Sequence, residues 1–337
     1  MSVLLSDYDY HLPGSMIAQQ PTKPRSGAKM LVYDRKRDRV DHAIVSDLCD
    51  FLPTDYAVIF NDAKVIKARL FGKKLSGGKI ELLIIKETKE GVLALIKGKV
   101  GEGTRLIFDR DLSAETLSLN GGGERLVRFF EANETIGFSR LLIIADRIGK
   151  TPLPPYIKRA ADADDDKRYQ SCFAKTPGSV AAPTASLHFD PPLLERVRSR
   201  YRWTEITLHV GLGTFKAVET DDIRDHKMHA ESYSIPPVAQ ALIDSKTPLI
   251  AIGTTVARAI EYYDRTRMAG GECDLFLYPR NPPRRLAALM TNFHLPRSTL
   301  FMLVCSLIGI EKTKELYALA IKSNYRFYSY GDAMLII

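Results

Sequence analysis

Two stretches of the chain combine histidine with small hydroxyl residues, a combination suited to acid–base chemistry on a closely held ligand. They are AAPTASLHF (residues 181–189) and TLHVGLGTFKAV (residues 207–218). A neutral imidazole exchanges a proton near pH 7, and small side chains let the backbone approach a ligand. His188 and His209 are therefore the first candidates for catalytic groups, although a histidine satisfied within a protein core fits the same pattern.

Gly211 and Gly213 follow residues 203–210, which alternate in polarity as a β-strand does. Ligands of α/β proteins bind beyond the carboxyl ends of strands, where glycines allow close contact. The pair lacks the third glycine that would complete a GxGxxG dinucleotide fingerprint. A tight turn after a buried strand is therefore an equally open interpretation of this pair.

The segments around these stretches alternate between strand and helix patterns. Residues 190–203 predict a short amphipathic helix that leads into a strand, and residues 249–253 predict a strand that runs into the helical pattern TTVARAIEYY. Residues 298–310 and 312–323 predict two consecutive helices, the first capped by Ser298 or Thr299. This alternation is typical of an α/β domain.

Residues 56–128 have a different character. Short runs of aliphatic and β-branched residues, such as KIELLII and VLALIK, are separated by turns that contain glycine. Strands spaced so closely leave no room for the helices that a parallel sheet requires. We therefore expect an α/β main domain formed by residues 1–55 and 150–337, with an inserted all-β, barrel-like domain at residues 56–149. Residues 135–148 predict a helix with Gly149 after it.

Composition favours a cytoplasmic protein without a membrane span. The chain has 337 residues, of which 45% are hydrophobic, enough for a large core and two domains. Its longest apolar run, residues 300–310, is far shorter than the roughly 20 residues that cross a bilayer. The four cysteines form no CxxC pair, which disfavours a disulfide framework or a zinc site and fits a reducing compartment.

Two further segments carry carboxylates. The run ADADDD at residues 161–166 follows a proline-rich, extended loop and lacks the glycine and glutamate positions of a calcium loop, so it predicts a solvated acidic loop or a helix N-terminus. The segment DHKMHAE at residues 225–231 brings two histidines near a glutamate, as a zinc site does. It is not an HExxH motif, so a structural or substrate-contacting role is expected, and no metal.

The formal net charge is +8, which favours a polyanionic partner. Six basic residues fall within sixteen positions: Lys64, Lys67, Arg69, Lys73, Lys74 and Lys79. We expect them to contact nucleic acid. A solvated strand face is the alternative, because no aromatic side chain or groove has been placed beside them.

The motifs in their order resemble the S-adenosylmethionine:tRNA ribosyltransferase-isomerase family along nearly the whole chain. Besides the two histidine stretches, the resemblance rests on DYDYHLPGSMIAQQP, FNDAKVIKARLFG, GGKIELL, PLPPYI, DHKMHAE, AIGTTVARAIE, TNFHLPRSTLFMLV and YRFYSYGDAMLI. It implies a β-barrel inserted in an α/β domain. It also implies a reaction: the ribosyl group of S-adenosylmethionine is transferred and isomerised onto 7-aminomethyl-7-deazaguanine at the tRNA wobble position. The products are epoxyqueuosine-tRNA, adenine and methionine, and the partner is a tRNA anticodon stem-loop.

Such a reaction needs a base for a proton beside the sulfonium and a donor for the departing adenine. We expect His188 and His209 to be catalytic and their two clusters to form one pocket wall. Asn292 is expected to read a base edge, and Arg258 to pair with the methionine carboxylate. The complete set of expected substrate contacts is Thr184, Thr207, Gly211, Gly213, Thr214, His229, Arg258, Asn292, His294 and Asp332.

Other functions stay open at this point. The chain departs from the family pattern at Ala63, Lys64, Lys67 and Ser186 and around Arg280 to Arg285, as a paralogue acting on a related base would. A non-catalytic RNA-binding protein would share the basic β domain. A methyltransferase would share S-adenosylmethionine, but an early GxGxG loop is missing. The expected state is a monomer.

Overall fold

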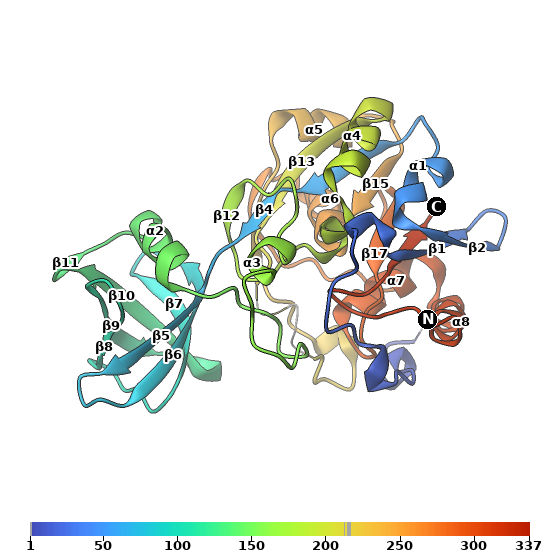
Figure 1. Ribbon diagram of the computed structural model, residues 1–337. Coiled ribbons are helices and arrows are strands. Elements are labelled where there is room, and N and C mark those ends of the chain that lie inside the picture. The colour runs from blue at the N-terminus through green and yellow to red at the C-terminus, as the bar shows by residue number, and fades with distance from the viewer. Residues whose placement is uncertain (1, 212, 214–216) are drawn as a thin grey trace.

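The computed structural model describes residues 2–211, 213 and 217–337. Its main body is built on a nine-stranded mixed sheet, with the β-barrel standing apart as a second lobe (Figure 1). The strand order is β16 (Gly270–Cys273), β14 (Glu231–Ser234), β13 (Arg202–Leu208), β3 (Ala57–Asn61), β15 (Leu249–Ile252), β17 (Leu286–Asn292), β18 (Ala333–Ile336), β1 (Lys29–Asp34) and β2 (Arg39–Ile44). The four strands β13, β3, β15 and β17 run parallel at the centre. The carboxyl ends of these four strands therefore meet at one edge of the sheet.

Alternate residues of the central strands face two different cores, as the two-residue period of a strand requires. On β3, Val58 and Phe60 pack in the core that includes α4 (Pro191–Arg200). Ala57 and Ile59 face the core that includes α5 (Pro237–Asp244) and α6 (Thr254–Thr266). The sheet is thus covered by helices on both faces, which is the expected α/β arrangement.

A third core packs helices α7 (Thr299–Ile308) and α8 (Ile310–Lys322) beside β1 and β18. The predicted cap is present, since the Ser298 hydroxyl accepts from the Phe301 N–H at 3.2 Å. No helix in the described part of the chain is long and apolar enough to cross a membrane.

The second lobe is a closed antiparallel barrel. Its strands follow the order β11 (Glu134–Thr135), β10 (Glu124–Glu131), β7 (Val92–Lys97), β6 (Lys79–Glu87), β5 (Arg69–Lys74), β8 (Arg105–Ile107) and β9 (Leu112–Leu119). β9 also pairs with β10, so the sheet closes on itself. Helix α2 (Phe138–Ile148) packs Leu141, Ile144 and Ala145 into the barrel core. The predicted inserted barrel is confirmed.

The predicted start of the barrel is wrong. The close spacing of strands predicts that residues 57–61 belong to the insertion, but they form β3, a central strand of the large sheet. All five residues of β3 are buried, which is typical of a parallel strand covered on both faces. The chain then passes through β4 (Ala63–Val65), which pairs with β12 (Thr176–Ser179), before it enters the barrel.

The two connections of the barrel lie side by side. Arg69 and Lys150 form an antiparallel bridge, in which the Lys150 N–H donates to the Arg69 carbonyl at 2.9 Å. Gly149 makes this approach feasible, because a Cβ there would lie 2.2 Å from the Lys67 carbonyl oxygen. The chain therefore enters and leaves the barrel at one point.

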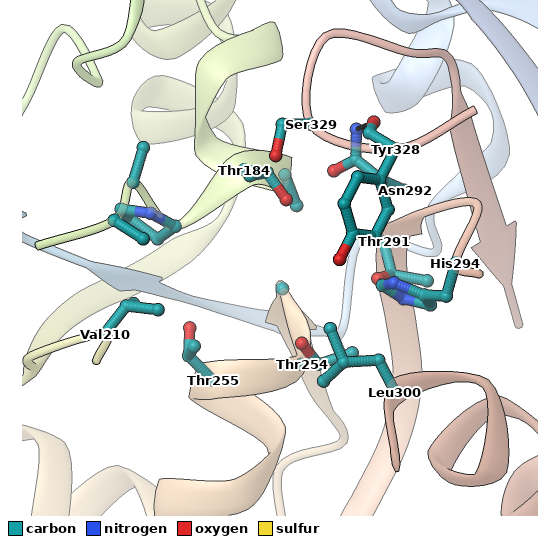
Figure 2. Close-up of a pocket in the computed structure, with 15 residues that line it drawn as sticks. Thr184, Val210, Thr254, Thr255, Thr291, Asn292, His294, Leu300, Tyr328 and Ser329 are labelled. Carbon is teal, nitrogen blue, oxygen red and sulfur yellow. Dashed lines mark hydrogen bonds between the residues drawn. The ribbon is translucent and has the colours of Figure 1, made fainter. Parts of the chain in front are cut away.

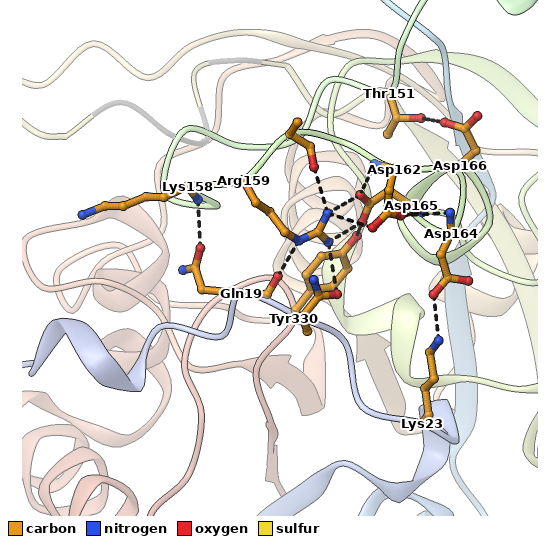
Figure 3. Close-up of polar contacts among 12 residues, drawn as sticks. Gln19, Lys23, Thr151, Lys158, Arg159, Asp162, Asp164, Asp165, Asp166 and Tyr330 are labelled. Carbon is orange, nitrogen blue, oxygen red and sulfur yellow. Dashed lines mark hydrogen bonds and ion pairs between the residues drawn. The ribbon is translucent and has the colours of Figure 1, made fainter.

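The segment that returns from the barrel, residues 151–168, is tied down by its acidic run (Figure 3). The Asp165 carboxylate is 1% exposed and accepts from Arg159 at 2.5 and 2.7 Å and from the Tyr330 hydroxyl at 2.8 Å. Burial raises the pKa of Asp165, but these hydrogen bonds outweigh burial and lower it. Asp165 opens α3 (Asp165–Arg168), so the prediction of a helix N-terminus holds and that of a solvated side chain is wrong at this position.

Candidate active site

A pocket lies beyond the carboxyl ends of β13, β15 and β17 (Figure 2). It is lined by Ala181 to Ala185 before α4, Val210 after β13, Gly253 to Thr255 at the start of α6, Leu300 in α7, the end of β17 with the loop after it, and the loop before β18. From β3 the chain runs to β13 on one side and later returns to β15 on the other, and such a reversal leaves a crevice where ligands bind. In this conformation the pocket has a free volume of about 40 Å³, so a nucleoside enters only when side chains at its wall rotate.

Asn61 and Asp62 join the ends of the strands beside the pocket. The Asn61 amide donates to the Leu208 carbonyl at 2.9 Å and accepts from the Leu208 N–H at 3.1 Å, which joins the ends of β3 and β13. Asp62 accepts from the Thr207 hydroxyl at 2.6 Å. These two residues were missed from the sequence. A polar pair at the end of a buried apolar run was the available signal, since Asn61 is the last residue of β3 and Asp62 follows it.

His188 lies behind the pocket. It ends the 3-10 helix Thr184–His188 and is 5% exposed, with Nε2 at 3.1 Å from the Asn292 amide nitrogen. Burial lowers the pKa of His188 to about 4, so the ring is neutral at pH 7. It faces a small side cavity that Arg25 and Arg168 also line.

His294 lies in the pocket wall. Its Nε2 is 2.9 Å from the Thr291 hydroxyl, and burial lowers its pKa to about 3. Thr184 and Asn292 also line this pocket, so three of the expected substrate contacts come together here.

His209 faces a different space, a groove of about 1090 Å³ between the barrel and the main body. Its ring packs on Gly178, whose Cβ, if present, would lie 2.8 Å from the imidazole. Burial lowers the pKa of His209, and the nearby Asp62 opposes this shift. Nδ1 is buried and has no hydrogen-bond partner among the described residues. His188 and His209 thus do not share a pocket wall, although Val210, next to His209, lines both the pocket and the groove.

The glycine pair and His229 also line the groove. A Cβ on Gly213 would lie 2.5 Å from the His229 ring, so this glycine leaves room for the imidazole. Thr214 lies outside the described residues. Across the residues that the structure describes, no three His, Cys, Asp or Glu side chains gather as a metal site requires.

Arg258 is held within the protein. It is 3% exposed, forms an ion pair with Glu231, and donates to the carbonyls of Leu275 and Cys273, both at 3.0 Å. Glu231 in turn accepts from the Gly211 N–H at 3.0 Å. This arrangement favours a role for Arg258 in fixing the Gly211 turn over a contact with a ligand carboxylate.

Asp332 is similarly engaged. It is 2% exposed and accepts from the backbone N–H groups of Arg326 at 2.7 Å and of Lys29 at 3.1 Å. Its carboxylate therefore braces the loop before β18, behind the pocket.

Tyr328 and Ser329 are pocket residues that the sequence did not reveal. Tyr328 has φ 75°, a left-handed conformation that costs a bulky residue on the order of 1–3 kcal/mol and is concentrated at functional sites. The ring of Tyr156, from the segment that returns from the barrel, meets the Tyr328 ring at a centroid distance of 3.8 Å. The Tyr156 hydroxyl also bonds to Ser329. The returning segment thus touches the pocket wall.

The six basic residues divide into two groups. Lys67 and Arg69 are half-buried, with Lys67 Nζ 3.4 Å from Asp166 and Arg69 Nη1 3.4 Å from Glu81. Lys73 and Lys79 are exposed and lie opposite each other on β5 and β6, beside Lys74, while Lys64 is exposed on β4. Phe71, 55% exposed, shares the outer face of β5 with Lys73, which places an aromatic side chain next to the lysines.

Residues 5–336 match the family model described as queuosine biosynthesis protein. The chain is 52% identical over 339 residues to the S-adenosylmethionine:tRNA ribosyltransferase-isomerase of Campylobacter jejuni subsp. jejuni serotype O:6, covering 99% of both chains. It is 52% identical over 334 residues to the enzyme of the same name from Nitratiruptor sp., covering 99% of this chain and 98% of that one. The crystal structure of S-adenosylmethionine tRNA ribosyltransferase from Thermotoga maritima is also similar, with a TM-score of 0.56 and 32% identity over 98% of this chain and 100% of that one. The chain therefore belongs to the queuosine biosynthesis protein family.

Proposed function

We propose that this chain is an S-adenosylmethionine:tRNA ribosyltransferase-isomerase. It transfers and isomerises the ribosyl group of S-adenosylmethionine onto 7-aminomethyl-7-deazaguanine at the wobble position of tRNA, and it releases adenine and methionine. The observation that carries this function is Val210, a junction residue that lines both a small pocket and the wide groove between the two lobes. A reaction between a nucleoside and an RNA base brings two ligands together, and two neighbouring spaces could receive them. The names of the relatives support the same activity.

Within this reaction, His209 is the group best placed to take the C5′ proton beside the sulfonium. It lies next to the junction, it is neutral at pH 7 because burial lowers its pKa, and its Nδ1 has no partner among the described residues. The proton passes from C5′ to the imidazole, and the adjacent sulfonium stabilises the electron pair that stays on carbon.

The activity is tested with purified protein, S-adenosylmethionine and tRNA that carries the aminomethyl-deazaguanine, without added metal. Adenine, methionine and epoxyqueuosine-tRNA are the expected products, whereas S-adenosylhomocysteine would identify a methyltransferase and refute the proposal. His209→Ala should lower kcat by roughly 10²- to 10⁴-fold with tRNA affinity retained. His42→Ala, on the edge strand β2, is the matched control and should keep kcat.

We further propose that the anticodon stem-loop enters the groove and that Lys73, Lys74 and Lys79 contact its phosphates. Replacing all three with glutamine should lower the slope of log affinity against log salt by about 0.7 to 0.9 per lost contact. Lys246→Gln, at the amino end of β15, should leave the slope unchanged. An unchanged slope in the triple variant would assign these lysines to a solvated face.

Further proposals concern the enzyme as a whole. We propose that the enzyme acts as a monomer. All four cysteines are free, which supports a cytoplasmic location. We propose residues 66–149 as the inserted domain, because β3 and β4 pair with strands of the main body.

A further inference from the structure

We propose that Asn292 Oδ1 accepts a hydrogen bond from the exocyclic amino group of the adenine in S-adenosylmethionine, and that His188 is a positioning residue that fixes the Asn292 amide for this contact. The inference rests on the proposed function, and it gives His188 a role other than proton transfer. It names the part of the substrate that the enclosed pocket recognises.

The orientation of the Asn292 amide follows from its neighbours. Asn292 ends β17, and Figure 2 shows it beside Tyr328, across from Thr184 and Ser329. Its nitrogen lies 3.1 Å from the Tyr328 carbonyl oxygen and 3.1 Å from His188 Nε2. A carbonyl only accepts hydrogen bonds, so the atom that faces it must be the amide nitrogen, and both of its hydrogens are then engaged.

This orientation leaves Oδ1 unused. Asn292 is 2% exposed, and Oδ1 is buried without a hydrogen-bond partner among the described residues. Buried acceptors in folded proteins are nearly always satisfied, and a bare one in a pocket wall indicates a donor that arrives with a ligand.

The Tyr328 carbonyl is held in place independently. The left-handed backbone of Tyr328 turns this carbonyl so that it also accepts from the Gly331 N–H at 2.9 Å, while the Tyr328 N–H donates to Phe293 at 3.0 Å. A strained turn that presents one carbonyl to the Asn292 amide is a second observation for a functional orientation at this site.

His188 supplies the other acceptor only in its neutral form with the proton on Nδ1. Burial lowers its pKa, Asp332 opposes this shift, and Arg326 and Arg25 reinforce it. A protonated ring would present an N–H to the Asn292 NH₂ group, and the amide would have to turn its oxygen toward the Tyr328 carbonyl. The neutral imidazole therefore holds the amide nitrogen toward the Tyr328 carbonyl and leaves Oδ1, on a residue of the pocket wall, without a partner among the described residues.

The lining of the pocket favours the base over the rest of the ligand. Its described lining residues are small, apolar, hydroxyl, amide or aromatic, together with His294, which burial keeps neutral. The ammonium and carboxylate of the methionine part require charged or strongly polar partners. The chemistry of these walls suits a planar neutral base once side chains rotate to admit it, and the amino group of adenine is the donor that a single acceptor selects.

The test compares S-adenosylmethionine with its 6-oxo analogue, in which hypoxanthine replaces adenine, in the full chain with tRNA. The parent enzyme should prefer the amino substrate by about 10²-fold or more in kcat/KM, because the oxo group faces Oδ1 as a second acceptor. His188→Leu should reduce this preference at least tenfold with tRNA affinity unchanged. His188→Gln should retain it, since its amide oxygen accepts where Nε2 did. Asn292→Ala should abolish it.

Several outcomes would overturn the proposal. If the His188→Leu enzyme prefers S-adenosylmethionine over the 6-oxo analogue as strongly as the parent does, His188 does not position Asn292. If the His188→Gln enzyme folds but has no turnover, His188 takes part in proton transfer. If Asn292→Ala instead loses discrimination against the 2′- or 3′-deoxy analogue, Oδ1 binds a sugar hydroxyl. If His188→Leu does not fold, His188→Gln and Asn292→Ala make the same comparison. Failure of the parent to release adenine would refute the proposed function itself.

Discussion

Removal of the Glu231 carboxylate should destabilise the protein strongly, because Arg258 would remain buried without its counter-ion. The two side chains are 4% and 3% exposed, and Glu231 also holds the Gly211 N–H. Breaking a buried pair at one side costs about 3–5 kcal/mol. We therefore expect Glu231→Ala to lower the free energy of unfolding by this amount. Arg258→Met should also be destabilising, since it leaves the buried Glu231 carboxylate without its counter-ion.

The assay is urea unfolding at pH 7, and a double variant and a surface control sharpen it. Glu231→Leu with Arg258→Met removes both charges together, so it should be about 2 kcal/mol more stable than Glu231→Ala. Glu272→Ala, on the neighbouring strand β16, breaks an exposed pair with Lys86 at 3.6 Å and should cost about 1 kcal/mol or less.

The same variants distinguish two roles for Arg258. If Arg258 bound the methionine carboxylate, Arg258→Met would raise the KM for S-adenosylmethionine about tenfold or more in the single and double variants. If Arg258 only supports the Gly211 turn, Glu231→Ala and the double variant should shift the KM for S-adenosylmethionine equally. Both variants remove the Glu231 carboxylate that accepts from the Gly211 N–H. A Glu231→Ala protein within about 1 kcal/mol of the parent would refute the description of this pair as buried and interdependent.

Gly178→Ala should lower kcat at least tenfold while the protein stays folded, because the new methyl group would meet the His209 ring at 2.8 Å; single-turnover rates and thermal midpoints check this. Asp165→Ala should cost about 3 kcal/mol in urea unfolding, since it leaves Arg159 without its buried carboxylate, and a loss near zero would contradict the assigned burial. His294 has a folded pKa of about 3 against an unfolded value near 6.5, so the unfolded state binds the extra proton in between. The contribution of neutral His294 to the free energy of unfolding should be fully present above pH 6.5 and should fall by about 2 kcal/mol by pH 5. His294→Gln should flatten that part of the profile of unfolding free energy against pH.

The elements with a local signal were predictable from the sequence. Alternating strands between glycine turns identified the barrel, and the Ser298 cap marked the start of α7. The sequence did not predict that β3 belongs to the large sheet, because a short buried apolar run has the same pattern in a barrel and in a parallel sheet. Its partners β13 and β15 lie more than 140 residues away.

The charged site residues were harder to place for a related reason. Asp165 and Arg258 look like solvent-facing or ligand-binding groups in the sequence, yet each is buried against a partner that only the fold provides. The position of His188 depends in the same way on Asn292, which is 104 residues distant. Residue types therefore indicated which side chains gather near the site, but not which of them face a ligand. The catalytic role of His209 stays a prediction.

The bridge between Arg69 and Lys150 makes the barrel an inserted domain whose two ends are adjacent. The chain enters the barrel at Arg69 and leaves it at Lys150, and these two residues are hydrogen-bonded to each other. The two ends of the α/β body therefore lie next to each other where the barrel is inserted. Insertions of this kind enter an existing fold without rerouting its strands, since the loop they replace already began and ended at neighbouring points. The strands of the α/β body can thus pair as they do whether or not the barrel is present between residues 69 and 150.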